Sequence, residues 1–177
     1  MKVLKMKRFL VTALIVIAAY LLQCTVFSRL ELAGIKPNLL VIVTAAFGFM
    51  RGSKEGMLVG FVSGLLMDIQ FGDVIGLYAL IYLVTGYING LFERLYFDDD
   101  IKLPILLIAA SEFLYGVIIY FFMFLLRSDF DFLFYLNKII IPELIYTIGI
   151  TLILYPLILL INHKLESEEK RSASKFV

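Results

Sequence analysis

The chain has 177 residues, of which 62% are hydrophobic and 18% are charged. A soluble domain is usually about 45–50% apolar, so the composition excludes an ordinary soluble protein and indicates an integral membrane protein. The net charge of +1 says nothing about nucleic-acid or acidic partners, and we expect no nucleic-acid partner for a membrane protein of this kind. A single cysteine, Cys24, excludes a disulfide within the chain.

Apolar segments recur along the chain and predict an all-α integral membrane protein, a bundle of six transmembrane helices. The first follows a basic N-terminus; it is too long for a signal-peptide core and lacks a small-x-small cleavage site, so we expect it to be retained. The predicted helices cover about residues 9–28, 37–50, 55–69, 74–92, 103–126 and 139–162. They form a single membrane domain, residues 1–162, followed by a charged cytoplasmic tail, residues 163–177.

The second and third segments are short for a membrane crossing. They are either two full crossings or a re-entrant pair, and a re-entrant pair would place Arg51, Lys54 and Glu55 at mid-membrane, at a cost of several kcal/mol. Two crossings are therefore the better interpretation. With six crossings, twelve of the sixteen Lys and Arg residues fall on the side that holds both ends of the chain. The positive-inside rule then predicts that both termini are cytoplasmic.

Glycine occupies every fourth position at the start of the third segment. Residues four apart on a helix share one face, so Gly56, Gly60 and Gly64 leave a groove without side chains. Glycine within a helix costs about 1 kcal/mol relative to alanine, but in a membrane it permits the close backbone approach on which helix association depends. We predict that this groove packs against another helix, of this chain or of a partner. The same spacing adds three candidate residues, Asp68, Gly72 and Gly76.

Several carboxylates fall in or beside the predicted helices. Asp73 precedes the fourth helix and is expected to cap it, whereas structural and partner-binding roles are equally open for Asp68. Glu112 lies near the middle of the fifth helix, and an intramembrane carboxylate is a functional candidate by default. A structural role between two helices is favoured for Glu112 over proton transfer, transport or a partner contact. Glu143 is expected near the outer end of the sixth helix, where Lys138 could pair with it.

The sequence contains no residue pattern typical of an enzyme. Its single histidine, His163, lies at the end of the last segment, where it cannot serve an intramembrane serine hydrolase. There is no H-E-x-x-H motif, no Cys/His cluster and no nucleotide-binding glycine motif. We therefore expect no catalytic residues, no cofactor and no bound metal.

One ordered series of residues resembles a known family. It consists of Pro37-Asn38-Leu39, Arg51-Gly52, Gly56, Gly60-Phe61, Gly64-Leu65-Leu66 with Asp68, Gly76-Leu77, Ala79-Leu80 and Gly86-Tyr87. This series resembles the rod shape-determining protein MreD family. The resemblance implies a non-enzymatic scaffold of the bacterial cell-elongation machinery, located in the cytoplasmic (inner) membrane and embedded in the lipid bilayer. It also implies binding to the bitopic protein MreC and indirect cooperation with MreB and the wall synthases, a SEDS glycosyltransferase and its transpeptidase. Such a scaffold supports lateral peptidoglycan synthesis and rod shape.

That family is also similar to the substrate-binding subunits of energy-coupling-factor vitamin transporters, which are six-helix proteins of comparable size. A vitamin-binding transporter subunit is therefore the alternative function. Those subunits dock their transmembrane partner through an Ala-x-x-x-Ala pattern in the first helix, and Ala13, Ala18 and Ala19 do not have that spacing.

Overall fold

The computed structural model describes residues 2–31, 34–71, 75–96, 101–125 and 131–173, and these residues form helices without a β-strand. The six helices of at least 13 residues in this part of the chain are α1 (Lys2–Cys24), α3 (Leu39–Arg51), α4 (Ser53–Phe71), α5 (Leu77–Leu91), α6 (Lys102–Leu125) and α8 (Ile141–Ala173). Short helical turns join them: α2 (Val26–Arg29), η1 (Glu93–Leu95), α7 (Phe132–Tyr135) and the π-helical η2 (Leu136–Ile140).

Within the described residues, three helical stretches are long and apolar enough to cross a membrane. They cover Met6–Arg29, Lys102–Phe122 and Phe132–Arg171. Helices α3 and α5 are apolar but shorter, and α4 carries Lys54, Glu55 and Asp68. The fold is thus all-helical and compatible with a membrane bundle, whereas six full crossings remain a prediction.

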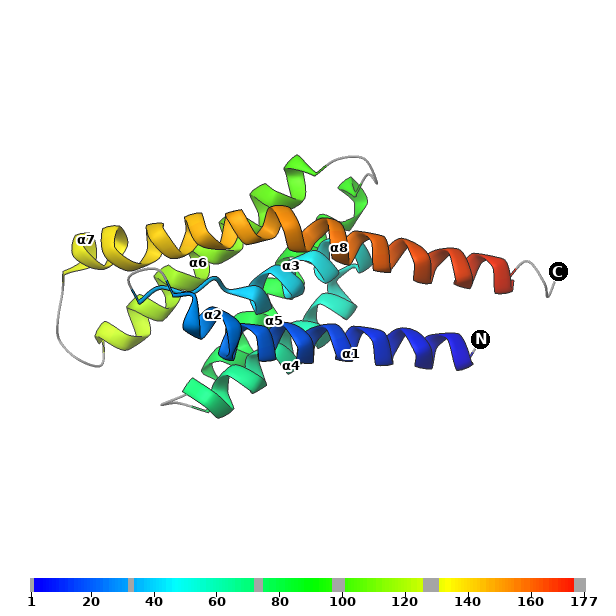
Figure 1. Ribbon diagram of the computed structural model, residues 1–177, viewed down its shortest axis with the longest axis horizontal. Helices are drawn as coiled ribbons and strands as arrows, with labels where there is room; N and C mark the ends of the chain where they lie inside the picture. Colours follow the sequence, from blue (N-terminus) through cyan, green and yellow to red (C-terminus); the bar gives the residue numbers. More distant parts are fainter. Residues whose placement is uncertain (1, 32–33, 72–74, 97–100, 126–130, 174–177) are drawn as a thin grey trace.

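Helix α3 is the centre of the bundle. It packs against α1, α4, α5, α6 and α8, and every residue from Leu39 to Met50 is buried. Figure 1 shows α3 between α1 and α8. Its N-terminus is capped by Asn38, whose side chain accepts a hydrogen bond from Val41 N at 3.3 Å. The Gln23 side chain of α1 accepts another from Leu40 N at 3.2 Å, so the first turn of α3 is satisfied inside the protein.

A single residue, Gly52, separates α3 from α4. Its φ of +85° lies in the left-handed region, which glycine adopts without the steric penalty of a Cβ atom. The sequence predicted helix ends at residues 50 and 55 with a charged loop between them. The two helices instead extend toward each other, because Gly52 allows the chain to reverse direction in one residue.

Both ends of the chain lie at the same end of the bundle (Figure 1). Lys7 on α1 forms an ion pair with Glu168 on α8 at 2.6 Å. Helix α8 runs to Ala173, beyond the predicted end at residue 162, because its polar extension consists largely of good helix formers. At 1.5 Å per residue its 33 residues span about 50 Å, well beyond a hydrocarbon core of about 30 Å.

Candidate functional site

The glycines of α4 lie directly against the backbone of α5. A Cβ atom added to Gly60 would collide with the carbonyl of Tyr82, and one added to Gly64 would meet the backbone of Ala79. A Cβ atom at Gly56 would collide with the carbonyl of Gly86. The helix that occupies the groove therefore belongs to this chain, and a partner helix cannot pack on the same glycines while α5 covers them.

Glycines on the neighbouring helices complete this contact. Cβ atoms at Gly86 and Gly90 of α5 would collide with the backbone at Gly56 and Ser53 of α4. A Cβ atom at Gly48 of α3 would lie 2.6 Å from the carbonyl oxygen of Gly86, so three helices meet at backbone contact. Sequence reasoning did not select Gly48 or Gly90, although the spacing of four between Gly86 and Gly90 repeats the pattern of α4.

Asp68 caps α5 from the end of α4. Its two carboxylate oxygens accept hydrogen bonds from the backbone N–H groups of Tyr78 and Ala79, both at 3.0 Å. Gly76 precedes α5 with a φ of +96° and has no side chain to provide a cap, so the acid of the neighbouring helix supplies it. Asp68 thus has a structural role as a cap of α5.

Among the described members of the series, Gly76 does not extend the groove. A Cβ atom at Gly76 would meet nothing within 4 Å, so this residue is not part of the packing face. Gly72 and Asp73 lie outside the described residues. The packing face thus consists of Gly56, Gly60 and Gly64 on α4.

Glu112 lies in the core where α6, α8 and the start of α3 meet. It is 2% exposed, and neither carboxyl oxygen has a hydrogen bond of regular geometry. Gly116, one turn further along α6, packs against Ile140, which places Glu112 beside the turns of α8 that hold Glu143 and Thr147. The Thr147 hydroxyl accepts a hydrogen bond from Asn38 N at 3.0 Å, and Asn38 Oδ1 accepts one from the Tyr82 hydroxyl at 2.7 Å. A polar network thus joins the carboxyl group to the N-terminus of α3.

Glu143 lies deeper than the sequence suggested. The helical stretch that contains it begins at Phe132, so Glu143 is about 17 Å from the start rather than at the end. It is half-buried, and within the part of the chain that the structure describes no ion pair joins it to Lys138. The packing of α6 on α8 therefore brings Glu143 near Glu112, and no ion pair among the described residues includes either acid.

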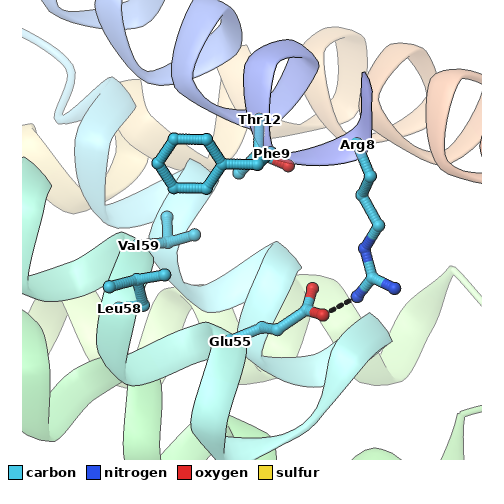
Figure 2. A pocket seen from close by; sticks show the side chains of 6 residues that line it. All are labelled: Arg8, Phe9, Thr12, Glu55, Leu58 and Val59. Atoms are coloured by element: carbon cyan, nitrogen blue, oxygen red, sulfur yellow. Dashed lines mark ion pairs between the residues drawn. The ribbon is translucent and has the colours of Figure 1, made fainter. Parts of the chain in front are cut away.

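Charged residues gather at the end of the bundle that holds the termini. Arg8 on α1 pairs with Glu55 on α4 and, at 3.6 Å, with Glu169 on α8. Arg51 at the end of α3 donates a hydrogen bond to Asn162 and lies 3.8 Å from Glu169. Figure 2 shows a recess of about 300 Å³ beside Arg8 and Glu55, lined otherwise by Phe9, Thr12, Leu58 and Val59. These ion pairs tie α1, α3 and α4 to the extension of α8.

A second recess of about 180 Å³ runs between α5 and α6. It is almost entirely apolar and includes Leu80, Ile81, Val84, Ile88, Leu114 and Ile118. Thr85 and Ser111 are its hydroxyl-bearing residues, and Ser111 also accepts a hydrogen bond from Asn89 Nδ2 at 2.7 Å. The lining extends from Leu77 to Ile88 on α5, a length of about 17 Å.

The described residues contain no group of three His, Cys, Asp or Glu side chains placed to bind a metal ion. Comparison with curated proteins and with solved structures gives no match. The family model of the rod shape-determining protein MreD matches residues 4–165, nearly the whole chain, and this confirms the resemblance seen over residues 37–91. The chain therefore belongs to the MreD family of membrane proteins, which has a role in determining rod shape.

Proposed function

We propose that this protein is a non-enzymatic scaffold of the bacterial cell-elongation machinery, and that it binds MreC through the recess between α5 and α6. Membership of the MreD family supports the role in rod shape. In this proposal the protein lies in the cytoplasmic membrane with both termini in the cytoplasm. We propose that its association with the wall synthases and with MreB is indirect and is mediated by MreC.

The apolar recess between α5 and α6 is the observation that carries the proposal. A bitopic partner needs a lipid-facing surface along which one apolar helix can lie, and this recess follows two helices for about 17 Å. Leu80, Val84 and Leu114 at its edge are 40–58% exposed and can contact such a helix. Thr85 and Ser111 add hydroxyl groups of the kind that join membrane helices.

The other two candidate surfaces are less suited to a single-span helix. The glycine face is covered by α5. The recess in Figure 2 contains the ion pair between Arg8 and Glu55, and an apolar helix lying there would have to desolvate both charges.

Tryptophan substitution in the recess tests the proposal. Leu114→Trp and Val84→Trp fill the space between α5 and α6, and we expect them to lower the amount of MreC that co-purifies in mild detergent. Ile153→Trp is the matched control, because Ile153 is 74% exposed on α8 and lines neither the recess beside Arg8 nor the recess between α5 and α6. Equal recovery of MreC with all three variants, at equal expression, would place the partner elsewhere.

A depletion experiment separates the scaffold from the transporter alternative. Loss of a scaffold should make rod-shaped cells round, and the Ile153→Trp variant should restore rod shape while Leu114→Trp should not. Normal shape together with lost uptake of a vitamin would contradict the scaffold function.

A further inference from the structure

We infer that Glu112 and Glu143 form an acid pair that binds one proton inside the membrane bundle. This goes beyond the proposed scaffold function, because it concerns the protein alone and does not depend on MreC. The first observation is that Glu112 is 2% exposed while neither of its carboxyl oxygens has a hydrogen bond of regular geometry. The second is that Gly116, one turn after Glu112 on α6, packs against the Ile140 side chain just before α8, which places Glu112 level with a second carboxylate, Glu143.

No cation of the described chain neutralises the pair. The ion pairs within the described residues involve other acids, and neither Glu112 nor Glu143 takes part in one. The other titratable groups that face the pair are phenols: Tyr78 and Tyr82 on α5, Tyr115 on α6 and Tyr135 on α7. Two carboxylates that share a poorly solvated site cannot both remain ionised, since the repulsion and the loss of solvation add together.

A proton fits this site better than a metal ion. Metal ions of the Mg²⁺ or Ca²⁺ type need about six oxygen ligands and space between them, whereas the site offers two carboxyl groups on two packed helices. Glu112 lines neither of the two recesses described above, and a proton requires no cavity.

The start of α3 stabilises the single charge that remains on the pair. The Asn38 N–H group donates to the Thr147 hydroxyl, which leaves the hydroxyl proton of Thr147 free to point toward Glu112. The positive end of the α3 dipole lies on the same side, and such a helix N-terminus favours a nearby anion. The pair is thus built to hold one proton and one negative charge.

Glu143 is the member through which the proton can exchange. It is half-buried, and its neighbours Pro142 and Tyr146 line a recess of about 550 Å³ that reaches Ile35 in the segment before α3. Glu112 is 2% exposed and does not line this recess, so Glu143 is the more accessible of the two acids.

Infrared spectroscopy of the purified full-length protein tests the inference. We expect wild-type protein at neutral pH to show the carbonyl band of a protonated carboxylic acid, and the Glu112→Gln/Glu143→Gln variant to lack it. Absence of the band in the wild type would overturn the acid pair.

Thermal unfolding across mildly acidic to alkaline pH supplies an independent readout. Over this pH range the unfolded chain ionises both carboxyl groups whereas the folded protein keeps one proton on the pair, so the melting temperature of the wild type should fall as pH rises. Glu112→Gln keeps the shape of the neutral acid and should flatten this fall, whereas Glu31→Gln, at an exposed ion pair with Lys36, should keep it.

Two results of that experiment would contradict the inference. One is a melting temperature that falls equally with rising pH in the wild type and in Glu112→Gln. The other is a higher melting temperature of the wild type in Na⁺ or K⁺ than in choline, which would indicate a bound metal cation. If Glu112→Gln fails to accumulate, Glu143→Gln at the half-buried position gives the same comparison.

Discussion

The carboxylate of Asp68, at the end of α4, accepts a hydrogen bond of 3.0 Å from the backbone N–H of Tyr78 in the first turn of α5. The second carboxylate oxygen accepts from Ala79 N at the same distance. One side chain thus satisfies two of the free N–H groups at the start of α5 and holds the connection between the two helices. Because Asp68 is buried, water could not take over as acceptor for the N–H groups of Tyr78 and Ala79 if the carboxylate were removed.

Removal of this cap should destabilise the bundle. We expect Asp68→Ala to lower the free energy of unfolding by about 1–3 kcal/mol, because it leaves two buried N–H groups unpaired. Asp68→Asn keeps one acceptor and should have a smaller effect. Asp131→Ala is the control, because Asp131 caps the four-residue α7 at an exposed site through a hydrogen bond of 3.4 Å. We expect Asp131→Ala to leave the free energy of unfolding unchanged within error. Thermal unfolding in detergent measures all three, and equal losses for Asp68→Ala and Asp131→Ala would contradict the capping role.

A methyl group on the glycine face should be enough to disturb it. Gly60→Ala places a Cβ atom on the Tyr82 carbonyl, so the two backbones must separate, and we expect a loss of about 1–3 kcal/mol. Gly149→Ala on α8 is the control, because it is the same substitution within a helix. The added Cβ atom meets nothing within 4 Å, so the variant should be as stable as the wild type or more stable by up to about 1 kcal/mol. The folded fraction after heating, measured by size-exclusion chromatography, compares them. Tolerance of Gly60→Ala at the level of Gly149→Ala would show that the helices are not in backbone contact.

Arg51 should matter more than Lys7 at the charged end of the bundle. The Arg51 side chain is 6% exposed and donates to Asn162, which is itself buried. Arg51→Met leaves the Asn162 oxygen without its donor and should cost about 1–3 kcal/mol. Lys7→Met removes an ion pair between side chains that are 52% and 36% exposed, and should cause no measurable change at high salt. Chemical denaturation at low and high ionic strength distinguishes the two, and a salt-dependent loss for Arg51→Met would argue against a buried hydrogen bond.

Cysteine labelling tests the orientation. In a Cys24→Ser background we expect Asp131→Cys to react with a membrane-impermeant maleimide in intact spheroplasts. Ser167→Cys, on the same continuous helix that runs from Phe132 to Arg171, should react only after permeabilisation. The basis is the twelve-to-four division of Lys and Arg together with the ion pair between Lys7 and Glu168, which requires both ends of the chain on one side. The reverse labelling pattern would invert the topology.

The sequence alone determined the helical composition of this protein, its family resemblance and the packing character of α4. Six apolar segments predicted the six main helices to within a few residues at most ends, because hydropathy and glycine spacing are local properties of the chain. The larger differences lie at the two outer helices: α1 begins at Lys2 instead of residue 9, and α8 continues to Ala173 instead of ending at residue 162. The ion pair between Lys7 and Glu168 joins these two extensions.

Only the tertiary structure decided which elements meet. Spacing within α4 shows that Gly60 belongs to a packing face, but not that Tyr82 of α5 occupies it, since any apolar helix with small residues could do so. Likewise the capping of α5 by Asp68 depends on where the end of α4 lies in space. The approach of Glu143 to Glu112 has the same origin: the two acids are on different helices, and their separation is set by how α6 and α8 pack around the start of α3.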